Sequence, residues 1–351
     1  MNTKTEETPL YVNLNYNNEV IRLAQNENPY GASPKVLEAI QKNIKSVSLY
    51  PDVILTELKE KLSIKNNVSP NEIIVAPGSC ALIAQLISRL VKSDENVVIS
   101  KLSFIAYKLC AKIYNRECRE AEMENYHVSL KNILSLTDVK TKLIFIANPN
   151  NPTGTFFTKT ELLSFLKEIP PTTYVVLDDA YNEYVTAQNF PDVLSIYKQY
   201  ENIIILHSFS KIYGLAGLRI GYGIMQKPII DDFEANRVPF SVNSIANIAV
   251  LAALDDIEYL QKCASENTKE RKFLINKLRM LEYNVIESQG NFIFLYFSTT
   301  EKRDNVYDVL FKNKIVVRKM DTFGDNKAFR ISIGKPEENK KIVECLTKYN
   351  K

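Results

Sequence analysis

The sequence predicts an α/β fold, with a mostly parallel sheet whose strand ends carry the chemistry. Three apolar runs, at residues 142–147, 174–177 and 203–206, have the length and character of buried strands. A polar residue suited to binding or catalysis follows each run: Asn151, Asp178 and Lys211. Because ligands of open α/β sheets bind outside the carboxyl ends of the strands, these residues predict one shared site.

The composition allows one large domain and a smaller one, and it argues against nucleic acid as a partner. The chain has 351 residues, of which 45% are hydrophobic, enough for a sizeable core. Its 44 basic and 41 acidic residues leave a net charge of +3. Charges so close to balance, without a long basic block, do not make the footprint of a nucleic-acid-binding protein.

The cysteines and the lack of long apolar runs predict a cytoplasmic protein without a membrane anchor. Five scattered cysteines form no Cys-x-x-Cys pair, and only two histidines are present. This argues against a metal site and favours reduced thiols. Residues 1–10 lack the apolar core of a signal peptide, and no apolar run approaches transmembrane length.

Residues 207–223 hold the most informative lysine of the chain. A lysine at a strand end, such as Lys211, can become a Schiff-base nucleophile if its pKa is lowered. Ser208, Ser210 and Arg219 can hold a phosphate, the arginine through its two-pronged fork. The spacing of the glycines is not that of a dinucleotide loop. Taken alone, the segment also fits a glycine-rich loop with an exposed lysine and a structural arginine.

Two further strand ends indicate binding functions. Residues 73–76 predict a strand that turns at Gly78 and Ser79 into a helix, an arrangement that binds anions. The run 174–177 ends in Asp178 and Asp179, and a carboxylate in such a place needs a partner. The residues alone do not choose between these two aspartates.

The remaining pattern predicts a polar arm, several helices and a smaller α/β unit. Residues 1–20 form the arm, and Ser33 with Pro34 predicts a helix start, the helix running to about residue 44. Further helices are predicted at about 244–254, 256–281 and 302–313, and further strands at 97–99, 291–297, 315–318 and 328–334.

The segment around Lys211 resembles the lysine segment of fold-type I pyridoxal-phosphate enzymes, and most of all the histidinol-phosphate aminotransferase branch. The string Asn-Pro-Asn-Asn-Pro-Thr-Gly at 148–154 and Asp-Asp-Ala-Tyr at 178–181 resemble further signatures of that family. The resemblance covers roughly residues 20–340. It implies a large α/β domain at 31–258 and a small α/β domain built from 1–30 and 259–351.

The resemblance also implies roles around the cofactor, pyridoxal 5′-phosphate. Lys211 would carry the aldehyde, Asp178 the ring nitrogen, and Tyr181 with Asn151 the 3′ oxygen. Phe104 would stack on the ring, although the usual preceding proline is absent. The phosphate would bind the side chains of Ser208, Ser210 and Arg219 and the backbone of Ser79 and Cys80, where two usual acids are missing. Tyr50 would reach the phosphate across a homodimer interface, so that the active sites are shared.

Three residues would bind substrate by the same resemblance: Arg330, Arg318 and Asn28. Arg330 lies in an apolar strand, where a buried guanidinium needs a partner such as a substrate carboxylate. Arg318 would lie near the phosphate end of the substrate, and Asn28 beside the active site. The implied activity is transfer of an amino group between glutamate or 2-oxoglutarate and a small phosphorylated compound, with the freed amine of Lys211 as the general base.

One departure bears on the substrate. Relatives usually carry a Pro-Tyr-x-Pro-Gly-Lys-like segment before the Asn-Glu-Asn-Pro turn, and its tyrosine helps to bind substrate phosphate. Residues 9–16 of this chain lack it, which favours a different, smaller phosphorylated substrate.

Two rival functions remain open at this stage. The same fold supports decarboxylation of a phosphorylated amino acid, such as threonine or serine phosphate, which differs in which bond of the substrate α-carbon is broken. An aminotransferase-like sensor domain of a regulator would need an added DNA-binding module, for which the chain shows neither spare length nor a basic face.

Overall fold

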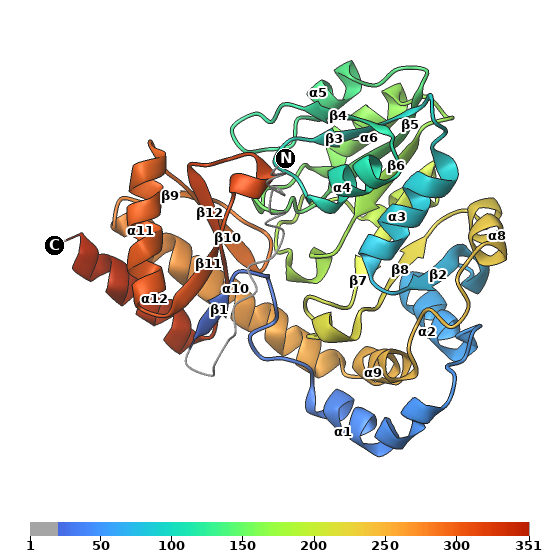
Figure 1. The fold of residues 1–351 in the computed structure, drawn as a ribbon, viewed down its shortest axis with the longest axis horizontal. Coiled ribbons are helices and arrows are strands. Elements are labelled where there is room, and N and C mark those ends of the chain that lie inside the picture. Colours follow the sequence, from blue (N-terminus) through green and yellow to red (C-terminus); the bar gives the residue numbers. More distant parts are fainter. Residues whose placement is uncertain (1–19, 351) are drawn as a thin grey trace, which may run out of the picture.

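The computed structural model describes residues 20–350, which form a large domain around one sheet and a small domain around another (Figure 1). Most of the polar arm predicted at residues 1–20 therefore lies outside the described residues. The large sheet has seven strands in the order β2-β8-β7-β6-β5-β3-β4. Their bounds are Ile73–Ala76 (β2), Asn96–Ser100 (β3), Glu117–Ala121 (β4), Thr141–Ala147 (β5), Tyr174–Asp178 (β6), Ile203–Ser208 (β7) and Gly221–Ile224 (β8).

The mostly parallel character of the large sheet is confirmed. β4, β3, β5, β6 and β7 pair in parallel, and only β8 runs antiparallel to its neighbours β7 and β2. We did not predict β8, because its glycines indicated a loop. Gly221 has a steric reason to be there: a Cβ at this position would lie 2.8 Å from the backbone nitrogen of Ser79.

The strands of the large sheet are buried on both faces, as parallel strands usually are. Alternate residues of β7 enter different cores: Ile203 and Ile205 one, Ile204 and Leu206 the other. Helices α3 (Ser79–Leu90), α4 (Ala106–Ile113) and α8 (Lys227–Ala235) cover one face. The other face is covered by α1 (Pro34–Asn43), α2 (Thr56–Asn66), α5 (Leu130–Ser135), α6 (Lys159–Glu168), α7 (Val193–Tyr197) and α9 (Ser244–Leu254).

The start predicted for the first helix is confirmed. Ser33 is the N-cap of α1 and accepts a hydrogen bond from the N–H of Val36, and Pro34 is the first helical residue. The helix ends at Asn43 and continues as a short 3₁₀ helix over Ile44–Ser48.

The small domain joins both ends of the described chain in a five-stranded sheet of order β1-β11-β12-β10-β9. β1 (Ile21–Leu23) pairs in parallel with β11 (Ile315–Lys319). The other strands are β9 (Asn284–Ile286), β10 (Phe292–Tyr296) and β12 (Ala328–Ser332). The long helix α10 (Ile257–Met280) runs from the large domain to the small one, where α11 (Thr300–Lys312) and α12 (Pro336–Tyr349) complete the layer (Figure 1).

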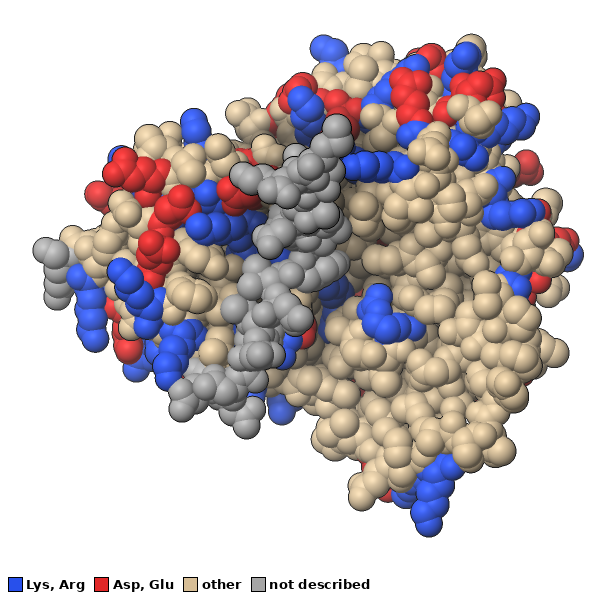
Figure 2. All heavy atoms as spheres, in the orientation of Figure 1, with Lys and Arg blue, Asp and Glu red and all other residues tan. Residues whose placement is uncertain are grey.

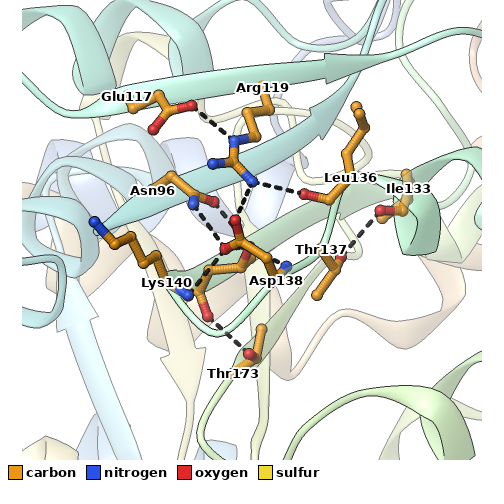
Figure 3. Close-up of polar contacts among 10 residues, drawn as sticks. Asn96, Glu117, Arg119, Ile133, Leu136, Thr137, Asp138, Lys140 and Thr173 are labelled. Carbon is orange, nitrogen blue, oxygen red and sulfur yellow. Dashed lines mark hydrogen bonds and ion pairs between the residues drawn. The ribbon is translucent and has the colours of Figure 1, made fainter. Parts of the chain in front are cut away.

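A polar cluster closes the edge of the large sheet at the amino ends of its parallel strands (Figure 3). Arg119 on β4 donates to Glu117 at 2.7 Å and to the carboxylate of Asp138 at 2.7 Å. Asn96, at the start of β3, donates to the same carboxylate at 3.2 Å. The hydrogen bond from Arg119 is the main cause that lowers the pKa of Asp138 to about 2. This cluster fixes strand starts and lies at the edge opposite the strand ends that carry Asp178 and Lys211.

We predict that Asp138→Asn lowers the melting temperature at neutral pH and that the difference closes in acid. A carboxyl whose pKa is lowered by folding stabilises the protein above its unfolded pKa, about 3.9. That contribution is lost as the pH falls toward the folded value of about 2. Thermal unfolding between about pH 7 and pH 2 measures it. Asp94→Asn, in an exposed turn of the same domain, is the matched control. If Asp138→Asn lowers the melting temperature equally at every pH, the lowered pKa of Asp138 is contradicted.

Candidate functional site

A cavity of about 390 Å³ lies at the carboxyl ends of β5, β6 and β7. It brings together residues that are far apart in the sequence, and most of the residues singled out above line it: Ser79, Cys80, Phe104, Asn151, Asp178, Tyr181, Ser208, Ser210, Lys211, Arg219, Arg318 and Arg330. Tyr50 and Asn28 do not.

One end of the cavity is built to bind an anion. Helix α3 begins at Ser79, its N-cap Gly78 has no side chain to cap it, and its first turn contains no acid. The first N–H groups and the positive end of the helix dipole therefore remain for a ligand. Arg219 adds a guanidinium, which donates to Ser210 at 3.3 Å. The φ angle of Gly78 is 83°, which favours glycine, and a Cβ there would lie 2.7 Å from Nη2 of Arg219, so a larger residue would displace the guanidinium.

Asp178 also lines the cavity, as a buried carboxylate. The hydroxyl of Tyr107 donates to Oδ2 at 2.7 Å, and the N–H of Ala180 donates to Oδ1 at 3.3 Å. Burial raises the pKa of Asp178, against the opposing effect of these hydrogen bonds and of the charge on Lys211. A cationic ring nitrogen placed here would relieve that burial cost.

Lys211 follows β7 and lines the same cavity. Its Nζ donates to the backbone carbonyl of Gln25 at 3.1 Å and lies 5.6 Å from the centre of the Tyr181 ring. The ring of Tyr181 meets Phe292 edge-on, with centres 5.1 Å apart. The amine is therefore held beside a phenol in the cavity.

Arg330 and Asn151 form the side of the cavity that faces the small domain. Arg330 on β12 is 5% exposed. Its Nη1 donates to the side-chain oxygen of Asn151, and its Nη2 donates to the carbonyl of Ala24 at 2.7 Å. Because Arg330 holds the oxygen of Asn151, the amide nitrogen of Asn151 is left as the donor end for a ligand. Arg318 on β11 also lines the cavity, beside Thr322.

Tyr50 and Asn28 lie elsewhere. Tyr50 is 83% exposed and packs against Phe240, with ring centres 4.6 Å apart and the ring planes tilted by 35°. Asn28 is buried, donates to the carbonyl of Ile212 at 2.7 Å and accepts from the N–H of Tyr30 at 3.0 Å. In this chain Asn28 therefore stabilises the segment next to Lys211 and does not line the cavity.

Sequence reasoning missed two parts of the site. Tyr107, which holds Asp178, follows Phe104 by one helical turn, and that spacing was the available signal. Residues 24–27 also line the cavity, and the interpretation of this segment as a turn did not single out Asn26.

Asp179, next to the cavity, does not line it. Burial is the main cause that raises its pKa well above the usual value, and the charges of Glu183 and Asp178 add to the effect. His207 lies 3.7 Å away, and burial lowers its pKa to about 3, so this imidazole is neutral at physiological pH. Of the two adjacent aspartates, the structure therefore assigns Asp178 to the cavity.

As a whole, the cavity suits a ligand that carries a phosphate and a protonated aromatic nitrogen. It is also lined by an amine, a phenol and an aromatic side chain, Phe104. This is the donor set that pyridoxal phosphate requires.

Among the described residues, no helix is both long and apolar enough to cross a membrane.

Comparisons with known proteins identify the family of the chain. The model of the family "Aminotransferase class I and II" matches residues 18–346. A histidinol-phosphate aminotransferase of Anaeromyxobacter sp. (strain Fw109-5) is 39% identical over 328 residues, which cover 93% of this chain and 90% of that protein. The corresponding enzyme of Geobacillus sp. (strain WCH70) is 36% identical over 332 residues, with 94% and 90% covered.

Solved structures of similar proteins have the same fold as this chain. The histidinol-phosphate aminotransferase of Sinorhizobium meliloti, solved in complex with pyridoxal-5′-phosphate, superposes with a TM-score of 0.89 at 25% identity over 95% of this chain and 91% of that one. The putative enzyme of Erwinia carotovora atroseptica gives 0.88 at 25% identity, with 94% and 96% covered. The chain therefore belongs to the class I and II aminotransferases and has their fold-type I architecture.

Proposed function

We propose that this chain is a pyridoxal-phosphate-dependent aminotransferase that moves an amino group between glutamate or 2-oxoglutarate and a small phosphorylated compound of the histidinol-phosphate type. The observation that carries the proposal is the single cavity that contains Asn151, Asp178, Tyr181, Lys211 and Arg219. The substrate class is supported by the names of the relatives, which are 35–39% identical.

Different residues of the cavity would hold different parts of the cofactor. The N-terminus of α3 and Arg219 would bind the phosphate, and Asp178 would pair with the ring nitrogen. Pairing with a buried carboxylate is worth about 1.5–3 kcal/mol for a hydrogen bond to a charged group. The bound cofactor supplies the electron-withdrawing ring that makes the α-proton of an amino acid acidic.

Lys211 would move that proton. Its Nζ is tethered by one hydrogen bond to the backbone of Gln25, so it can leave that contact when a substrate enters. A free amine at this place is the base that takes the proton from the α-carbon of the amino donor. Tyr181 and Asn151 would fix the ring so that this bond faces the lysine.

Arg330 and Arg318 would bind the substrate. Arg330 is buried and donates to neutral oxygens of Asn151 and Ala24. A substrate carboxylate is a stronger acceptor than either of these, because it is charged. Arg318 lines the same cavity from β11 and would contribute positive charge for the phosphate of the larger substrate.

We also propose that the protein works as a homodimer in the cytoplasm. Apolar side chains are exposed together around residues 47–54 and 238–240: Val47, Leu49, Tyr50, Ile54, Val238 and Phe240. The two segments touch, since Tyr50 packs against Phe240. Such a contiguous apolar surface marks a protein interface. The free cysteines fit a reducing compartment, and recovery of the native protein from a secreted fraction would contradict that part.

We predict that Tyr50→Phe weakens binding of the cofactor without dissociating the dimer. The change keeps the ring that packs against Phe240 and removes the hydroxyl proposed to reach the phosphate in the partner subunit. Loss of one such hydrogen bond raises the dissociation constant about tenfold. Equilibrium dialysis and light scattering measure the two quantities, with Tyr349→Phe as the matched control. A monomeric wild-type protein, or unchanged affinity in Tyr50→Phe, would reject the shared site.

The amino-transfer reaction is tested by absorbance. Adding glutamate alone to the cofactor-loaded enzyme should bleach the visible band and release 2-oxoglutarate. Arg330→Ala should raise the glutamate concentration needed for half-maximal bleaching by about 30-fold or more. Removal of one partner of a buried ionic contact costs at least about 2 kcal/mol. Lys327→Ala, an exposed change just before β12, should leave this concentration unchanged.

The second substrate is identified by testing turnover of a panel of phosphorylated carbonyl acceptors, starting with imidazole acetol phosphate. Turnover of that compound would assign the histidinol-phosphate substrate, and turnover of smaller members only would assign the smaller substrate that residues 9–16 favour. A band that glutamate leaves unchanged, together with carbon dioxide release from threonine or serine phosphate, would replace the transaminase by a decarboxylase.

A further inference from the structure

Asn26 lies between the two domains, in the segment that follows β1. It is 1% exposed, and it lines the cavity together with Gln25 and Glu27. Its Nδ2 donates to the phenolic oxygen of Tyr181 at 3.0 Å. The roles proposed above give Tyr181 a ligand to hold but do not use Asn26.

The orientation of the Asn26 amide is fixed from the small domain. The hydroxyl of Ser332 donates to Oδ1 of Asn26 at 3.1 Å, and the N–H of Asn26 donates to the same hydroxyl oxygen at 2.8 Å. Asn291 donates to the carbonyl of Asn26 at 3.0 Å. With Oδ1 accepting from this hydroxyl, the amide presents its N–H group to Tyr181.

This contact fixes the direction of the proton on the phenol. A hydroxyl has one hydrogen to donate, and its oxygen accepts from other donors. The oxygen of Tyr181 accepts from Asn26, so the hydrogen of Tyr181 points to another acceptor. We propose that Asn26 is a positioning residue, which holds the hydroxyl hydrogen of Tyr181 toward the ligand in the cavity.

The residue type at position 26 fits this role. The φ angle of Asn26 is 55°, in the left-handed region that asparagine, aspartate and glycine tolerate best. Aspartate is nearly isosteric but carries no N–H, so it would accept the hydrogen of Tyr181 and turn it away from the cavity. Glycine keeps the backbone conformation and removes the amide. The position therefore offers two variants that differ in polarity without straining the chain.

Other neighbours of Tyr181 hold its ring and leave the direction of its hydrogen to Asn26. Phe292 packs edge-on at 5.1 Å between ring centres, and Nζ of Lys211 lies 5.6 Å from the ring centre. The charged side chains that line the same cavity are Asp178, Lys211 and Arg219 on the large domain, Arg318 and Arg330 on the small domain, and Glu27 in the segment between them. Asn26 thus couples a small-domain hydroxyl, Ser332, to a large-domain phenol.

The inference rests on the proposed function, because it needs a cofactor oxygen that accepts the hydrogen of Tyr181. A hydrogen bond donated to that oxygen stabilises its anionic form and makes the adjoining lysine nitrogen easier to deprotonate. Losing the donor should therefore raise the pH at which the visible absorption of the cofactor-loaded enzyme changes. The readout needs no substrate and no turnover.

The experiment is a pH titration of the visible spectrum for cofactor-loaded wild type and variants. Tyr181→Phe should raise the midpoint by about one pH unit, as loss of one hydrogen bond does. Asn26→Gly should raise it by about half as much, because the hydrogen is then free to rotate. Asn26→Asp should raise it at least as far as Tyr181→Phe, because the hydrogen is drawn away.

The double variant Tyr181→Phe/Asn26→Gly decides whether Asn26 acts through the phenol. Its midpoint should equal that of Tyr181→Phe alone, since no hydroxyl is left to position. A midpoint unchanged by Asn26→Gly, or an equal further shift in the double variant, would overturn the proposal. If Asn26→Asp fails to fold, the comparison of Asn26→Gly with the double variant still decides whether Asn26 acts through the phenol. Failure of the proposed function looks different: the wild type would then bind no cofactor or show no titrating band.

Discussion

The site depends on the parallel pairing of β5, β6 and β7. In this register Ala147 lies opposite Asp178, and Asp178 lies opposite Leu206, so β5 and β6 end side by side and β7 continues for two more residues. Side chains alternate between the faces of a strand, and a shift of one residue would exchange the faces of Asp178 and Asp179. The register therefore decides which of two adjacent carboxylates lines the cavity and which does not.

The charged groups of the cavity are held in place by the protein itself. Asp178 accepts from Tyr107, Lys211 donates to the carbonyl of Gln25, and Arg330 donates to Asn151. Groups arranged in this way need little reorganisation when a ligand arrives. The same contacts also set a limit on affinity, because the ligand must exchange them for its own.

Both domains contribute to this arrangement. Ala24, Gln25 and Asn26 come from the segment that joins the small sheet to the large domain, and each makes one of the contacts that fix the cavity. On the face shown in Figure 2, charged side chains of both signs lie mainly around the rim, and the large domain presents a broad uncharged surface. The residues that line the cavity come from both domains.

The sequence allowed prediction of the fold class and of the strands that end at the site, because buried parallel strands appear as unbroken apolar runs. It did not predict β8, whose glycines permit close packing against α3 and resemble a loop. The lining residues found in advance belong to short local strings such as 148–154. Asn26 was missed because its partner is 155 residues away, and only the folded chain brings the two together. Asn28, its neighbour in the same string, serves the packing of the lysine segment.

The most direct test of this account is to find where the cofactor is attached. Borohydride reduction of the purified, cofactor-loaded protein followed by peptide mass mapping should place the pyridoxyl group on Lys211, at the end of β7. A label on another lysine, or the absence of any label after reduction of a protein that binds the cofactor, would contradict the claim that these strand ends form the active site.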